Sequence, residues 1–171
     1  AGIGSRRVAA ALMDRFAEVL SVGGGMIGWS RVLQASEVPV DAPFEVVQFR
    51  REARGCLSYL VISGGEALVV DPAPGVAPYL EEAEARGLRV RYVIETHLHA
   101  DFVSGHRELA ARTGATVLIS HLADATFPHR GVKDGEVVRV GGLSLEFRET
   151  PGHTPESISV VVTDLGTSDR P

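Results

Sequence analysis

Two histidines and an aspartate stand at alternate positions in the run Thr96-His97-Leu98-His99-Ala100-Asp101. The run follows a mostly apolar stretch, residues 90–94, that we expect to be a strand, and it precedes a helical pattern. Three such side chains on one loop can converge on one or two metal ions, and imidazole nitrogen with carboxylate oxygen suits zinc or iron. The competing interpretation is a solvated loop that carries histidines by chance. We predict a metal site that uses His97, His99 and Asp101.

A further histidine, His153, lies in the turn Pro151-Gly152-His153-Thr154-Pro155 soon after a strand pattern. Glycine leaves room for close approach, and the prolines restrict the backbone on both sides, so the turn can hold His153 in a fixed position. His153 is therefore a candidate ligand from a distant part of the chain.

The other histidines and the cysteine have simpler interpretations. His106 falls in the first turn of a predicted helix, where we expect a surface or capping side chain. His121 and His129 lie in an irregular stretch that we expect to be an exposed loop. Cys56 lies in a strand pattern, and we expect it to pack as a small hydrophobic residue.

The elements that must position these loops are strands and helices in mixed order. Strand patterns cover residues 44–51, 56–62, 67–70, 90–95, 115–119, 137–140, 143–147 and 157–163, and helix patterns cover 76–85 and 104–114. The stretch 67–70 is uniformly apolar, so we expect it at the centre of a sheet. The fold class is therefore α/β, in the layered α+β sense.

The bulk composition excludes several classes of function. The chain has 171 residues, of which 44% are hydrophobic and 23% charged, as in an ordinary globular protein. A formal net charge of -5 gives no electrostatic case for nucleic acid or an anionic membrane. No apolar run approaches the roughly 20 residues that span a bilayer. The one cysteine, Cys56, excludes an internal disulfide and fits a reducing cytosol, so we expect a cytoplasmic protein.

The histidine loop at 96–101 and the turn at 151–155 together resemble the metallo-β-lactamase superfamily over residues 44–165. Asp71-Pro72 after an apolar strand is also typical of that superfamily. The resemblance implies part of an αββα sandwich.

Within the superfamily, the sequence is most similar to the persulfide dioxygenases, particularly forms fused to rhodanese domains. The run Thr96–His106 carries this likeness, supported by Gly55-Cys56-Leu57-Ser58-Tyr59. The resemblance implies a mononuclear iron(II) enzyme in sulfur metabolism that oxidises a thiol persulfide, such as glutathione persulfide, with O2 to sulfite and thiol.

Phe102 departs from the binuclear hydrolases of the superfamily, which place a metal-binding histidine directly after the aspartate. By resemblance, His97 and His153 would hold iron, while His99 and Asp101 would hydrogen-bond or orient groups beside it. A rival interpretation is a zinc thioester hydrolase of the glyoxalase II type, in which the three histidines hold one metal and Asp101 a second. A non-catalytic sulfur-binding module is a third.

The resemblance also implies a third iron ligand, an aspartate in a Gly-Asp turn beyond the last predicted strand, and this sequence has no such turn. Asp164 and Asp169 are expected to be surface turn residues. We therefore expect residues 44–171 to be the N-terminal, incomplete portion of a metallo-β-lactamase-like domain in a longer protein. The sequence leaves open whether that protein forms a homo-oligomer.

Residues 1–36 resemble the closing portion of a rhodanese-like domain, on the segments Ala1–Arg6 and Val22–Trp29. In that family a loop of backbone amides cradles an anionic persulfide. The family's nucleophilic cysteine would fall at Ala1, so we expect no sulfurtransferase activity from this segment. Residues 37–43, which contain Pro39 and Pro43, are expected to be a linker to the second domain.

Overall fold

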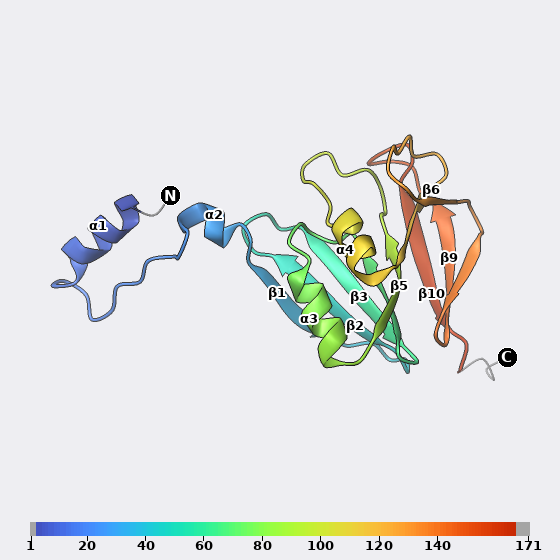
Figure 1. The fold of residues 1–171 in the computed structure, drawn as a ribbon, viewed down its shortest axis with the longest axis horizontal. Helices are drawn as coiled ribbons and strands as arrows, with labels where there is room; N and C mark the ends of the chain where they lie inside the picture. The colour runs from blue at the N-terminus through green and yellow to red at the C-terminus, as the bar shows by residue number, and fades with distance from the viewer. Residues whose placement is uncertain (1–2, 167–171) are drawn as a thin grey trace.

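The computed structural model of the chain describes residues 3–166, which form helices and two β-sheets (Figure 1). The helices are α1 (Ile3–Leu12), α2 (Gly25–Trp29), α3 (Ala77–Ala85) and α4 (His106–Thr113). The strands are β1 (Leu33–Val38), β2 (Glu45–Arg51), β3 (Leu57–Ser63), β4 (Glu66–Val70), β5 (Arg89–Ile94), β6 (Thr116–Ser120), β7 (Arg130–Val132), β8 (Val137–Val140), β9 (Leu143–Glu149) and β10 (Ile158–Asp164). None of the described helices is long and apolar enough to cross a membrane.

Strands β1 to β7 form one seven-stranded sheet in chain order, and β8 to β10 form a three-stranded antiparallel sheet. The first four strands of the large sheet pair antiparallel, whereas β4 to β7 pair parallel. Parallel neighbours need a crossover, and α3 and α4 supply it between β4 and β5 and between β5 and β6. As a result, β4 and β5 end at the same edge of the sheet, and the loops that follow them meet there.

The two faces of the large sheet enclose two separate cores. Alternate strand residues such as Phe49 and Val69 pack with Tyr79 of α3 on the helix-covered face. The intervening residues, such as Leu68, pack against Phe147 of the small sheet. Figure 1 shows the same three layers, with α3 and α4 on one side of the large sheet and the small sheet on the other. The predicted α/β layered fold is confirmed, and the uniformly apolar stretch 67–70 lies in the central strand, β4.

The N-terminal part differs from the sequence-based expectation. Leu33–Val38 forms the edge strand β1, paired with β2 from Leu33 opposite Arg51 to Val38 opposite Val46. The first two residues of the expected linker at 37–43 are therefore part of the sheet. Pro39 and Pro43 suggested a linker, but Glu37 and Val38 pair with β2, and this pairing decides their structure. Whether residues 1–36 belong to a separate rhodanese-like domain remains a prediction.

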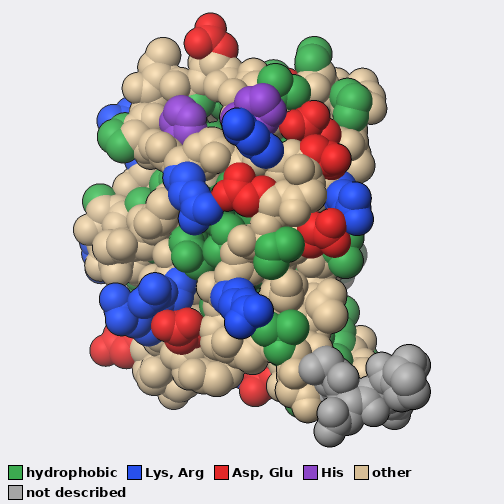
Figure 2. Space-filling view, turned by 90° about the vertical axis from the view of Figure 1, so that its right-hand side faces the viewer, with side chains coloured by type: hydrophobic (Ala, Val, Ile, Leu, Met, Phe, Trp, Pro, Cys, Tyr) green, Lys and Arg blue, Asp and Glu red, His purple; other side chains and the backbone are tan. Residues whose placement is uncertain are grey.

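The outer face of the small sheet carries charges of both signs. Figure 2 shows this side of the molecule, where acidic and basic side chains are interspersed with isolated hydrophobic ones. Arg148 and Glu146 form one such pair, with Nη2 and Oε1 2.8 Å apart. No extended basic surface of the kind that binds nucleic acid is visible on this face.

Candidate metal centre

The loop that follows β5 is fixed by Asp71, the first residue after β4. Asp71 has a φ of 49°, in the left-handed region that aspartate tolerates better than most residues. Its Oδ1 accepts a hydrogen bond from the backbone N–H of Thr96 at 2.8 Å, and its Oδ2 accepts one from the Thr96 hydroxyl at 2.7 Å. The side chain of Asp71 therefore fixes the start of the histidine loop from the neighbouring parallel strand.

The Thr96 hydroxyl in turn determines which ring nitrogen of His97 carries the proton. Its single hydrogen is donated to Asp71, so at His97 Nδ1, 2.9 Å away, Thr96 Oγ1 acts as the acceptor. His97 therefore carries its proton on Nδ1, which leaves the lone pair of Nε2 for another partner. Burial is the main cause of a lowered pKa at His97, with a smaller contribution from the neighbouring His99, and the neutral ring that a metal requires is favoured.

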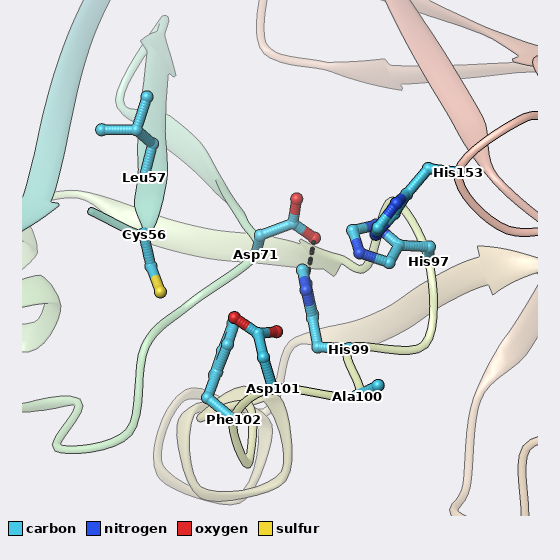
Figure 3. A pocket seen from close by; sticks show the side chains of 9 residues that line it. All are labelled: Cys56, Leu57, Asp71, His97, His99, Ala100, Asp101, Phe102 and His153. Carbon is cyan, nitrogen blue, oxygen red and sulfur yellow. Dashed lines mark ion pairs between the residues drawn. The ribbon is translucent and has the colours of Figure 1, made fainter. Parts of the chain in front are cut away.

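The His97 ring lies between the other two histidines of the prediction. Its centroid is 4.1 Å from that of His99 and 4.8 Å from that of His153 (Figure 3). His153 reaches this position from the loop between β9 and β10, in the other sheet. The backbone joins the two sheets here, because Ile158 N–H donates to the Thr96 carbonyl at 2.9 Å.

The Nε2 edge of the His99 ring faces two carboxyl groups, those of Asp71 and Glu95. Its Nε2 lies 3.1 Å from Asp71 Oδ1 and 3.7 Å from Glu95 Oε2. This nitrogen is buried and has no hydrogen bond of acceptable geometry, so the contacts are ion pairs when the ring is protonated. Burial lowers the pKa of His99, but the close contact with Asp71 and the negative charges of nearby carboxylates outweigh it, and the net pKa is raised.

Glu95 is the most buried acidic group of the site, with 3% of its surface exposed. Burial raises its pKa to about 8, against the effect of the Ser104 hydroxyl, which donates to Glu95 Oε1 at 2.7 Å. On the far side, His106 Nδ1 lies 3.6 Å from the same oxygen. The expectation that His106 is a surface side chain is wrong, because it is 8% exposed and stacks on Phe127.

The predicted site residues line one pocket of about 510 Å³. Its lining comprises Cys56, Leu57, Asp71, His97, His99, Ala100, Asp101, Phe102 and His153. Figure 3 shows the three histidines with Asp71 on one side and Cys56 with Leu57 on the other. Phe102 lies against His99, with ring centroids 4.4 Å apart. His121 and His129 are exposed, as predicted, and neither lines this pocket.

Cys56 lines the pocket because of the register in which β3 pairs with β4. Strands β3 and β4 are antiparallel, with Tyr59 opposite Val70, so the start of β3 lies beside the end of β4. Cys56 immediately precedes β3, and its side chain is partly exposed in the pocket. The expectation of a simply packed cysteine is therefore incomplete, since its thiol faces the same space as the histidines (Figure 3).

The donor set fits a metal ion. Within residues 3–166, no protein hydrogen bond is made by His97 Nε2 or His99 Nδ1. Lone pairs on adjacent imidazoles without protein partners are what a zinc or iron site requires. Among the described residues, single ligand atoms of Asp71, Glu95 and His99 also lie within 4.8 Å of one another. We interpret that second group as support for His99, because both oxygens of Asp71 already accept hydrogen bonds from Thr96.

Sequence reasoning missed Glu95 and the role of Asp71 in the site. A detectable signal existed for Glu95, because it is an acidic residue directly after the apolar and buried end of β5, Val93-Ile94. Asp71 was noted only as typical of the superfamily. Asp164 was expected to be a surface turn residue, but it is the half-buried last residue of β10 and does not line the pocket. Its Oδ1 accepts a hydrogen bond from the backbone N–H of Gly166. Asp169 lies outside the described residues.

The sequence of this chain matches a known protein family and several known proteins. Residues 51–167 match the family described as the metallo-beta-lactamase superfamily. A hydroxyacylglutathione hydrolase of Rhodopseudomonas palustris (strain HaA2) is 38% identical over 104 residues, which are 60% of this chain and 40% of that protein. The human mitochondrial persulfide dioxygenase ETHE1 is 33% identical over 147 residues, which are 85% of this chain and 53% of that protein.

Two solved structures share the architecture. A metallo-beta-lactamase from Staphylococcus aureus superposes with a TM-score of 0.68 at 33% identity, covering 75% of this chain and 41% of that one. ETHE1 from Myxococcus xanthus superposes with a TM-score of 0.55 at 27% identity, covering 77% and 53%. The chain thus spans about half or less of the length of these relatives.

Proposed function

We propose, since this chain belongs to the metallo-beta-lactamase superfamily, that it is part of a mononuclear iron(II) persulfide dioxygenase. The overall reaction would convert a thiol persulfide, O2 and water into the thiol, sulfite and two protons. Its relatives include a persulfide dioxygenase and hydroxyacylglutathione hydrolases, so a small thiol-derived substrate is common to both alternatives.

Phe102 is the observation that carries this proposal. The residue directly after Asp101 lines the pocket and packs its ring on His99, yet it offers no donor atom to a second metal. A site that holds one metal with two histidines and a carboxylate leaves open coordination positions, which suits iron(II) oxygen chemistry. The likeness to human ETHE1 also extends over more of the chain than the likeness to the hydrolases.

His97 and His153 would hold the iron in this proposal. When bound, iron(II) would supply the open coordination positions and the electrons that activate O2. His97 is prepared for this role by the Thr96 hydroxyl, which keeps its proton on Nδ1. The ring contact between His97 and His153 shows that the two side chains already lie together.

The remaining pocket residues would bind and orient the substrate. His99 has Nε2 turned to Asp71, so its Nδ1 can accept a hydrogen bond or a proton from the substrate. Asp101, exposed at the mouth, would orient polar groups of the thiol carrier. Leu57, Ala100 and Phe102 are the apolar residues of the lining and would limit water around the reacting sulfur.

A zinc thioester hydrolase is the second candidate, and a specific observation favours it. Identity to the hydroxyacylglutathione hydrolase is higher, at 38%, and three histidine rings share the pocket. In that case His97, His99 and His153 would together hold one zinc ion, which supplies a nucleophilic water at neutral pH. The non-catalytic sulfur-binding module remains the third candidate.

The test compares metal and reaction in the same preparation. The intact parent protein is purified anaerobically, its iron and zinc are measured, and oxygen uptake and sulfite release are followed with glutathione persulfide. Iron with oxygen uptake supports the proposal. Zinc with thioester cleavage and no oxygen uptake would refute it, and a protein with neither metal nor turnover would support the binding module.

A pair of variants distinguishes the two ligand sets. If iron is held as proposed, His97→Ala abolishes metal binding, whereas His99→Ala leaves much of the iron in place. Equal loss of metal in both variants would indicate the three-histidine zinc site.

A further inference from the structure

We propose that Glu156 is a positioning residue, whose carboxylate holds the turn that carries His153 against the histidine loop, so that ligands from the two sheets reach one metal ion. This inference rests on the proposed function only for the presence of a metal, since His97 and His153 are ligands in both the iron and the zinc site. Glu156 does not line the pocket, so it acts through the two loops and not on the substrate.

The side chain of His153 has few contacts that could fix its position. It is exposed, and within residues 3–166 it makes no hydrogen bond or ion pair. Its ring contact is with His97, at 4.8 Å between centroids. The place of His153 is therefore set by its backbone turn, residues 150–157, and by where that turn lies relative to the histidine loop.

The turn itself is braced by its own hydrogen bonds. The Thr150 N–H donates to the Ser157 carbonyl at 2.9 Å, which closes the two ends of the turn. The Thr154 N–H donates to Ser157 Oγ at 3.2 Å, and the hydroxyl oxygens of Thr154 and Ser157 lie 2.7 Å apart. A turn braced in this way moves as one unit, so contacts outside the turn decide where His153 lies.

Two backbone groups of the histidine loop meet this turn. At the base of the turn, the N–H of the buried Ile158 donates to the Thr96 carbonyl at 2.9 Å. Further along, Glu156 Oε1 accepts the Leu98 N–H at 3.0 Å. Leu98 stands between His97 and His99, so this bond fixes the backbone from which both rings project. Figure 3 shows the outcome, with the His97 and His153 rings side by side although they come from separate loops.

The carboxylate of Glu156 has two properties that could matter, its length and its charge. Glu156→Gln keeps the length and an acceptor oxygen for the Leu98 N–H but removes the charge. Glu156→Asp keeps the charge but is shorter by one methylene group, which withdraws the acceptor beyond hydrogen-bond distance. If Glu156 holds the turn in position, the aspartate variant is impaired and the glutamine variant is not. If its charge attracts the metal ion, the reverse holds.

The experiment uses the intact parent protein with its metal removed. A zinc titration of each variant measures metal affinity, and hydrogen exchange of the metal-free protein follows the histidine loop and the turn, with β4 as the internal reference. The matched control is Glu66→Asp. Glu66 Oε2 also joins the two sheets, because it accepts the Gly141 N–H at 2.9 Å, but Glu66 is at the opposite end of β4 from Asp71.

We expect zinc affinity to fall about 10–100-fold in Glu156→Asp, as when outer contacts of ligand histidines are lost. In Glu156→Gln it should change by less than about 5-fold, the most that one exposed charge contributes. Glu66→Asp should bind zinc as the unmodified protein does. Exchange should accelerate in the turn and in the histidine loop of Glu156→Asp, and not in β4.

Equal losses of zinc affinity in Glu156→Asp and Glu156→Gln, or a loss in Glu156→Gln alone, would overturn the inference, because the charge would then be the active property. Unchanged affinity in Glu156→Asp would overturn it as well. If the unmodified protein bound no zinc or iron, the proposed function would fail, and the exchange experiment would still decide the role of Glu156. In that case, unchanged exchange in the turn of Glu156→Asp would refute the positioning role, and faster exchange confined to the two loops would support it.

Discussion

Replacement of Asp71 by asparagine tests how one side chain organises the whole site. Asparagine tolerates the left-handed φ of 49° about as well as aspartate, so the backbone is left unchanged. The amide oxygen can still accept the Thr96 N–H, but the amide nitrogen replaces the oxygen that accepts the Thr96 hydroxyl. The variant therefore removes one hydrogen bond to a charged acceptor.

The size of the effect follows from that bond. Hydrogen bonds to charged groups contribute about 1.5–3 kcal/mol, and Asp71 is only 15% exposed, so solvent screening is modest. For a chain of this size, 1 kcal/mol corresponds to about 2–4 °C, which predicts a fall in Tm of about 3–12 °C. The Thr96 hydroxyl would also turn toward His97 Nδ1 and move the proton of that ring to Nε2. Zinc affinity should then fall about 10–100-fold.

Thermal unfolding followed by circular dichroism, together with zinc titration, measures both effects. Asp134→Asn is the matched control, since Asp134 Oδ1 accepts the Glu149 N–H at 3.0 Å on the surface and an amide oxygen can replace it. That variant should change stability by less than about 0.5 kcal/mol. If Asp71→Asn were no less stable than Asp134→Asn and bound zinc equally well, the assignment of Asp71 as the organiser of the loop would be refuted.

Three further substitutions probe the surroundings of the site. Tyr79→Phe removes the buried hydroxyl that accepts the Ala73 N–H at 2.9 Å and should reduce stability by about 1–3 kcal/mol in thermal unfolding, so a loss below about 0.5 kcal/mol would contradict this role. Gly105→Ala places a Cβ 2.5 Å from the Ala73 carbonyl oxygen and should reduce stability by about 1–3 kcal/mol. The control Gly4→Ala has no atom within 4 Å of the added Cβ and should leave stability unchanged. Equal effects of the two substitutions would contradict the clash. Phe102→His should add a second metal equivalent by elemental analysis, and an unchanged metal content would show that Phe102 does not determine the stoichiometry.

The sequence was most informative where the chemistry is local. The histidine loop and the turn with His153 stand out as patterns of residue type and spacing, and the structure brings their rings together. Strand and helix positions around them were also predictable, because most residues of β4 and β5 are apolar and the crossovers have helical periodicity. Which of these residues binds metal remains a prediction.

Features that depend on strand register could not be predicted. Cys56 enters the pocket only because β3 starts beside the end of β4, and Glu95 meets His106 only because α4 begins against the end of β5. The pairing of residues 33–38 with β2 could not be predicted for the same reason, since the sequence of one strand does not specify which strand it pairs with. Glu95 and Asp71 therefore became recognisable as a pair around His99 only in three dimensions.

The division of the site between two sheets has a thermodynamic consequence. His97 and His99 follow a strand of the large sheet, whereas His153 follows a strand of the small one. An ion bound by both would act as a cross-link between the layers, and a ligand that binds only the packed state stabilises it by about 2.7 kcal/mol at 100 times its Kd. The concentration of available metal would then determine the stability of the packing between the two sheets. The metal-free protein would be the form most susceptible to proteolysis at the interface between them.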